Sequence, residues 1–310
     1  MLEGQPLMER RARSKFPAWF LAVVLALAAA AIITWPGRAE NLFLWRLTSP
    51  AGAQAYLAGS IHLAGPDLYP LPEPFVRAFE EAGSLVVEID TEALPLDVMS
   101  GFIAERGLAG PGLTLEDYLT PEARGLLAQS GLNRPEYSGY RPWLAALAIQ
   151  LAALEENGFF ARYGLDKHFL DQAAARGLPI VELETFAEQM NLLADLSPVE
   201  ADHFLRATLR EAEELPATLA DFWSAWRRGD ADGFAELFFR DFERYPELSG
   251  LMDRLVIRRN HIMLERLGPL LEQPGPPPFV VVGAGHLVGP EGLLALLARH
   301  DYRLEQLRRP

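Results

Sequence analysis

The chain has 310 residues, of which 50% are apolar and 23% are charged, and this globular composition excludes a disordered or fibrous protein. It contains no cysteine, which excludes disulfides, thiolate metal sites, a cysteine nucleophile and a lipid anchor on cysteine. The formal net charge of -14 argues against nucleic-acid binding, which needs a basic surface, so we expect no nucleic-acid partner.

The chain begins with a targeting segment. Basic residues at positions 10–15 precede an apolar run over 16–35, and small residues follow as far as Ala39. This order predicts a signal peptide, but the run is also long enough to span a bilayer as an uncleaved N-terminal transmembrane helix. We therefore expect residues 1–39 to be a signal peptide or a membrane anchor, the only contact with the membrane. Residues 40–310 are then one exported domain, either periplasmic (extracytoplasmic) or anchored to the cytoplasmic membrane facing outward.

The first part of the exported domain predicts strands around a helix. Leu42–Leu47 and Ala55–Gly59 are short strand-like runs that a Ser-Pro-Ala-Gly turn joins. Pro72–Ala82 has apolar residues on one helical face, and Ser84–Ile89 is a continuous apolar run, as in strands buried on both sides. The order strand, helix, strand indicates a βαβ unit, and hence parallel pairing.

The middle of the chain is helical by its periodicity. Pro142–Glu156 and Leu165–Arg176 carry apolar residues at helical spacing, and Ile180–Leu183 is a brief strand between helices. Amphipathic helix follows from Ser197, which has the sequence of a helix start, as far as Leu271. The many aromatic residues within this stretch recur at helical spacing, which predicts core packing rather than a platform for a cofactor or sugar.

The last part repeats the strand–helix–strand order. After a proline-rich connector, the pattern predicts a strand at Phe279–Val282, a helix at Gly289–Arg299 and a strand at Tyr302–Leu307. The expected fold class is α+β with α/β-like ends. Its mixed sheet is built from the N- and C-terminal strand–helix–strand units, with a large helical middle between them.

Two Gly-x-x-His sequences follow apolar strands near the two ends of the domain. The first ends at His62 and the second at His286. Both histidines lie at the carboxyl end of a buried strand, where open α/β sheets place ligands and catalytic groups. Glu88 follows Leu-Val-Val, and burying a carboxylate there is costly unless it has a partner. If the strands run parallel, these residues meet at one edge of the sheet.

Two imidazoles and a carboxylate suggest metal-assisted or acid–base chemistry. His62, Glu88 and His286 can hold a divalent cation of the Mn, Co or Zn class that keeps a position open for water. Without a metal, His62 can act as a general base that Glu88 orients. The structural alternative is an ordinary surface carboxylate and two hydrogen-bonded histidines.

Other polar residues are secondary candidates. Arg259 is placed to hold a substrate carboxylate or a developing oxyanion, although an arginine precedes it and the pair could form a solvated basic face. Asn260 beside it is a candidate for substrate binding. Glu184 is another, because it follows a strand, although it could equally cap a helix or face solvent. Asp166 begins a predicted helix, where an acid favours the helix dipole.

The motifs resemble those of a known family. The stretches Tyr56–Asp90 and Phe279–Leu297 are similar to the TraB/GumN family, also called TraB/PrgY/GumN, whose first motif is usually Gly-Thr-x-His, so Ser60 is a conservative departure. The resemblance implies a relation to the TIKI metalloproteases, which use two Gly-x-x-His motifs and a glutamate. It implies a more remote one to erythromycin esterases and haem-binding ChaN proteins. Carried over, it makes His62 and His286, with the glutamate described above, the metal or catalytic set.

The sequence therefore predicts an exported metal-dependent hydrolase of the TIKI-like peptidase type, which acts on a peptide or another small substrate. One alternative is a non-enzymatic exported module that binds a peptide, a haem-like ligand or a glycan. A second alternative is a metal-free hydrolase that uses a histidine base. The sequence indicates neither the substrate nor the oligomeric state.

Overall fold

A computed structural model of the chain describes residues 40–310. Its centre is a six-stranded mixed sheet with the strand order β4-β3-β5-β2-β1-β6. Together with the many helices, this sheet confirms the predicted α+β class. The strands are β1 (Asn41–Thr48), β2 (Gln54–Ser60), β3 (Ser84–Val87), β4 (Ile180–Glu182), β5 (Pro278–Gly283) and β6 (Arg303–Arg308).

Four of the strands, β4, β3, β5 and β2, run parallel to one another. At the other side of the sheet, β1 is antiparallel to both β2 and β6. Every residue of β5 is buried, as its unbroken apolar sequence predicts for a strand covered on both faces. By contrast, β6 has no fully buried residue and forms an edge of the sheet.

The predicted βαβ unit needs one correction. Helix α1 (Glu73–Glu80) joins β2 to β3, and these strands are parallel as predicted, but β5 lies between them. The C-terminal strands are not neighbours either, because β6 pairs with β1 rather than with β5. The fully apolar β5 gains most from the middle of the sheet, whereas the charged β6 is suited to an edge.

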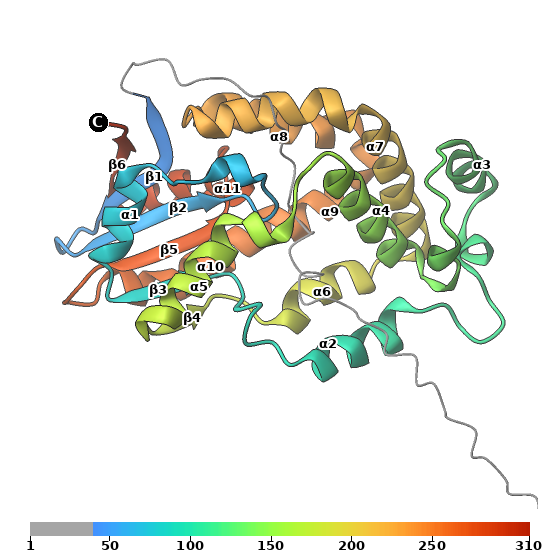
Figure 1. Ribbon diagram of the computed structural model, residues 1–310, viewed down its shortest axis with the longest axis horizontal. Coiled ribbons are helices and arrows are strands. Elements are labelled where there is room, and N and C mark those ends of the chain that lie inside the picture. Colours follow the sequence, from blue (N-terminus) through green and yellow to red (C-terminus); the bar gives the residue numbers. More distant parts are fainter. Residues whose placement is uncertain (1–39) are drawn as a thin grey trace, which may run out of the picture.

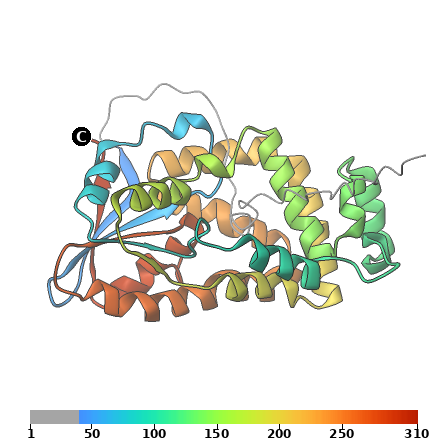
Figure 2. The same ribbon diagram turned by 60° about the horizontal axis from the view of Figure 1, so that its bottom comes forward.

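The helical middle lies mainly to one side of the sheet, as Figures 1 and 2 show from two directions. Ser197 caps the long helix α7 through a reciprocal capping box with Glu200, as the sequence predicts. The helices after α1 are α2 (Leu96–Phe102), α3 (Pro121–Gln129), α4 (Pro142–Glu156), α5 (Leu165–Arg176), α6 (Phe186–Ala194), α7 (Pro198–Arg227), α8 (Ala231–Arg244), α9 (Ser249–Met252), α10 (Arg258–Leu271), α11 (Ala284–Leu287) and α12 (Leu293–Arg299).

The segment after β5 also differs from the prediction. The predicted helix Gly289–Arg299 begins only at Leu293, because Gly289 has a φ of +83°, which a right-handed helix does not allow. The preceding residues form the one-turn helix α11, so His286 lies on a short helix rather than in an open turn.

The predicted signal peptide or anchor lies outside the described residues and stays a prediction. Within residues 40–310, no helix combines the length and the apolar character that a membrane crossing requires.

Candidate active site

The ends of three adjacent parallel strands form the candidate site. Strands β3, β5 and β2 lie side by side, and the last residue of β2, Ser60, pairs with Gly283, the last residue of β5. The residues after these strands therefore meet at one edge of the sheet. The structure brings His62, Glu88 and His286 together there, as the parallel arrangement predicts.

Gly283 is the point around which the three side chains gather. A Cβ atom at this position would lie 3.1 Å from His62 Nε2, 3.3 Å from Glu88 Oε1 and 3.6 Å from His286 Cδ2. Its φ of -51° suits any residue, so the site requires glycine for space rather than for backbone conformation. The Gly283 N–H also donates a hydrogen bond of 2.6 Å to Glu88 Oε1.

Asp166 holds His62. The imidazole Nδ1 lies 3.2 Å from Asp166 Oδ1, and the same oxygen accepts a hydrogen bond of 2.8 Å from Ser60 Oγ. Burial alone would lower the pKa of His62, but the charge and hydrogen bond of Asp166 raise this pKa to about 9. Asp166 sits in the first turn of α5, where an acid was expected for the helix dipole. The carboxylate that orients His62 is therefore Asp166, and not Glu88 as predicted.

Close packing of two backbone segments holds His62 and Asp166 in place. The N–H of Leu165 donates a hydrogen bond of 3.0 Å to the carbonyl oxygen of Ile61. A Cβ atom on Gly164 would lie 2.3 Å from the carbonyl oxygen of His62, so glycine is required at this contact. The start of α5 thus docks directly on the turn that carries the first histidine.

The hydrogen bonds of His286 define its tautomer. The Nδ2 of Asn260 donates a hydrogen bond of 2.7 Å to the carbonyl oxygen of Glu291, which can only accept. Asn260 Oδ1 therefore faces His286 Nδ1 at 2.6 Å and accepts a proton from it. His286 Nε2 is buried and has no hydrogen-bond partner in the described part of the chain. Burial, with the charge of Arg259, lowers the pKa of His286 to about 3.

Arg259 ties together the two buried carboxylates of the site. Its Nη2 donates hydrogen bonds of 2.6 Å to Glu88 Oε2 and to Glu184 Oε2. Its Nη1 donates a hydrogen bond of 3.0 Å to the carbonyl oxygen of Leu255. The side-chain nitrogen of Gln189 donates to the same two carboxylates, at 3.1 and 2.9 Å. Burial opposes ionisation of Glu88, but its cationic neighbours and a backbone N–H outweigh this and lower its pKa.

These contacts show where the secondary candidates lie. Arg259 is 3% exposed, so the alternative of a solvated basic face is wrong for it, whereas the side chain of Arg258 is 69% exposed. The side chains of Arg259, Glu184 and Asn260 all bind other protein groups here. Their direct contact with a substrate stays a prediction, and the structure gives each of them a positioning role.

Whether a metal ion fits this site depends on which nitrogen and oxygen atoms are not already hydrogen-bonded to the protein. Both histidines have Nδ1 bound to a protein acceptor, as metal-ligating histidines usually do, and among residues 40–310 the buried Nε2 of His286 has no hydrogen-bond partner. These imidazoles fit a divalent cation. The carboxylate of Glu88 fits less well, because a backbone N–H, Arg259 and an amide already occupy its oxygens. Over residues 40–310, no set of three or more histidine, aspartate or glutamate side chains is arranged to hold a metal ion.

Comparison with known proteins agrees with the motifs. The profile of the TraB/PrgY/gumN family matches residues 43–306. The chain belongs to the TraB/PrgY/gumN family. Its relatives include protein YbaP of Shigella flexneri and of Escherichia coli (strain K12). Each is 25% identical over 275 residues, which cover 86% of this chain and 96% of that protein.

A third relative comes from an animal. Metalloprotease TIKI2 of Danio rerio is 24% identical over 316 residues, which cover 86% of this chain and 61% of that protein. No solved structure matches the chain significantly. The predicted family is therefore confirmed, and so is the predicted relation to the TIKI proteins.

Proposed function

We propose that the protein is a hydrolase of peptide or other acyl bonds, in which water is activated between His62 and His286. One observation carries this proposal. Both imidazoles have Nδ1 held by a protein acceptor, and both surround the space that Gly283 leaves at the edge of the sheet. A histidine that is oriented through one nitrogen and presents the other is the arrangement used by general bases.

The proposed reaction divides the work between the two histidines. The Nε2 of His286 takes a proton from water, and the water oxygen bonds to the acyl carbon. The departing nitrogen or oxygen takes a proton from Nε2 of His62, whose other nitrogen stays on Asp166. Solvent then carries the extra proton from His286 back to His62, so that the cycle closes. The negative charge of Glu88 stabilises positive charge on either ring.

A metal-dependent form of this reaction is the second candidate. Two findings support it. The Nε2 of His286 has no hydrogen-bond partner within the part of the chain that the structure describes, and a relative carries the name Metalloprotease TIKI2. The ligands would be His62, His286 and Glu88, and the metal would be of the Mn, Co or Zn class. Such an ion would supply a bound water of lowered pKa. The N-terminal sequence further supports an exported location for either form, on the outer side of the cytoplasmic membrane.

The test compares matched histidine variants of the purified full chain. A library of defined peptides is incubated with wild type, His62→Ala, His286→Ala and His300→Ala, and products are read by mass spectrometry. His300 is the control, because it is exposed. We expect cleavage to fall at least 100-fold in the first two variants. Both should still unfold in a single cooperative transition at a lower midpoint, because each change removes the buried partner of Asp166 or Asn260. Equal cleavage by all four proteins would contradict the proposal.

A chelator separates the two forms. Loss of cleavage in EDTA, with recovery on adding Mn, Co or Zn, supports the metal-dependent form. Full cleavage in EDTA supports the histidine base alone. Retention of a peptide without any product would instead favour the binding-module alternative.

A further inference from the structure

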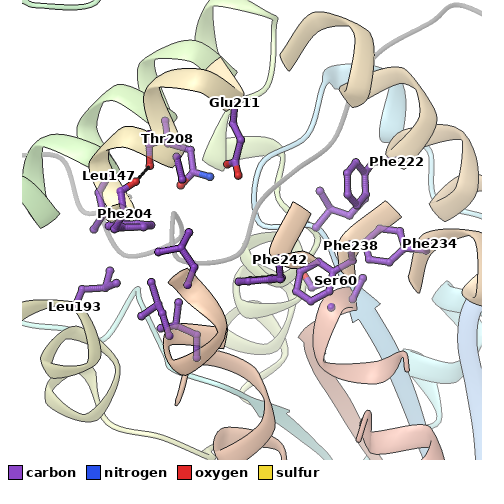
Figure 3. A pocket seen from close by; sticks show the side chains of 18 residues that line it. Ser60, Leu147, Leu193, Phe204, Thr208, Glu211, Phe222, Phe234, Phe238 and Phe242 are labelled. Atoms are coloured by element: carbon purple, nitrogen blue, oxygen red, sulfur yellow. Dashed lines mark hydrogen bonds between the residues drawn. The ribbon is translucent and has the colours of Figure 1, made fainter. Parts of the chain in front are cut away.

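A cavity lies beside the candidate site. Its volume is about 100 Å³, and Figure 3 shows the side chains that line it. Five aromatic rings belong to the wall, and they come from both α7 and α8. They are Phe204, Phe222, Phe234, Phe238 and Phe242.

The cavity and the candidate site share two stretches of backbone. Ser60 and Ile61 line the cavity directly before His62, and Ala284 and Gly285 line it directly before His286. In Figure 3, Ser60 lies with the α8 rings at one end of the cavity. The cavity therefore adjoins the backbone that carries both histidines, although neither histidine lines it.

The few polar groups of the wall are largely occupied. Ser60 Oγ donates to Asp166, and Thr208 Oγ1 donates 3.0 Å to the Phe204 carbonyl. Gln150 and Glu211 also line the cavity, and Glu211 too interacts within the protein. A polar ligand would find few unused donors and acceptors, whereas an apolar group would keep the existing hydrogen bonds intact.

We infer that this cavity is the specificity pocket of the proposed hydrolase, and that it holds a branched or aromatic apolar group next to the bond that is cleaved. This inference rests on the proposed function. The cavity has about 100 Å³ of space, which is less than the roughly 150 Å³ of an apolar cavity that holds a benzene-sized ligand. The occupant is therefore comparable to a leucine side chain or a short acyl group, and a phenylalanine ring is its upper limit of size.

The test uses the full chain and two series of probes. The first is the pentapeptide Ala-Ala-X-Ala-Ala with X as Gly, Ala, Leu or Phe, and the second is glycine acylated with chains of increasing length. Affinity is measured by calorimetry, and cleavage is followed separately. We expect Leu and Phe peptides to bind at least tenfold more tightly than Gly and Ala peptides. The acyl series decides whether an amino-acid side chain or an acyl chain is preferred.

Three variants test the location of the pocket. Leu147 lines the cavity and Leu144 does not, although both lie on α4 and are at most 1% exposed. Leu147→Ala should shift preference toward larger groups, whereas Leu144→Ala should leave preference unchanged at a similar loss of stability. Ala207→Leu, which fills the cavity, should weaken binding of the Leu and Phe peptides at least tenfold.

The outcomes separate the two proposals. Size-dependent binding that these variants alter, without any cleavage, keeps the pocket and overturns the hydrolase. Cleavage with no dependence on the size of X, or equal effects of Leu144→Ala and Leu147→Ala on preference, overturns the pocket and keeps the hydrolase.

Discussion

Replacing Arg259 by Met should destabilise the protein strongly. The change keeps most of the aliphatic stem but removes the cation between Glu88 and Glu184, which are 8% and 5% exposed. Two buried carboxylates would then face each other without a positive charge. Breaking a buried ion pair on one side costs about 3–5 kcal/mol, so we expect the free energy of unfolding at pH 7 to fall by about that amount.

Urea denaturation followed by circular dichroism measures this loss. The matched control is Arg258→Met, because that side chain is 69% exposed and pairs with Asp253 at the surface. An exposed pair contributes about 0–1 kcal/mol. Adding Glu184→Gln to Arg259→Met removes one of the opposed charges, and should restore at least ~1 kcal/mol of stability. If Arg259→Met costs no more than Arg258→Met, the guanidinium does not hold the carboxylates together, and our account of the site is wrong.

Three further predictions concern single positions. Gly283→Ala places a methyl group 3.1 Å from His62 Nε2, so peptide cleavage should fall at least tenfold while the urea midpoint changes little; unchanged cleavage would show that this space is not needed. Gly125→Ala meets open space inside α3 and should raise the free energy of unfolding by about 0.5–1 kcal/mol, as urea titration would show. Hydrogen bonds from Ser197 and Arg254 lower the pKa of Glu200 to about 2. The stability that this carboxylate contributes is therefore present above its unfolded pKa of 4.5 and is lost as pH falls toward 2. Glu200→Gln should accordingly lose less stability than wild type between pH 7 and pH 3, and identical losses would disprove this coupling.

The edge of the sheet could be predicted from the sequence because local signals agree there. An apolar run followed by Gly-x-x-His marks the end of a buried strand, and a glutamate after Leu-Val-Val needs a polar partner. Parallel strands then place His62 and Glu88 at the same edge, whatever their order in the sheet. The insertion of β5 was not predictable in this way, because strand order depends on contacts between distant segments.

Other parts of the site have no local signal. Asp166 is 104 residues from His62, and an acid at the start of a helix already has a sufficient local explanation in the helix dipole. Gln189 likewise lies within an ordinary helix, yet it binds both Glu88 and Glu184.

The aromatic stretch shows a further limit of periodicity. Helical spacing predicts core packing, and rings such as Phe222 and Phe234 do pack edge to face, with centroids 5.3 Å apart. The same rings also line the cavity. A helical pattern predicts which face of a helix is apolar. It does not predict whether neighbouring side chains fill the space against that face or leave a cavity.

The central place of β5 has a consequence for how the protein is made. Chains are synthesised from the N-terminus, and β2 can pair with β1 and β3 with β4, but these two pairs are not joined until β5 arrives between β2 and β3. Until β5 is synthesised, β2 and β3 therefore each have one unpaired strand edge. Such long-range pairing is slow and prone to aggregation. Truncation just before β5 should consequently divide the sheet into the separate pairs β1–β2 and β3–β4 rather than trim its end. For the same reason, His62 and His286 cannot come together until nearly the entire chain has been synthesised.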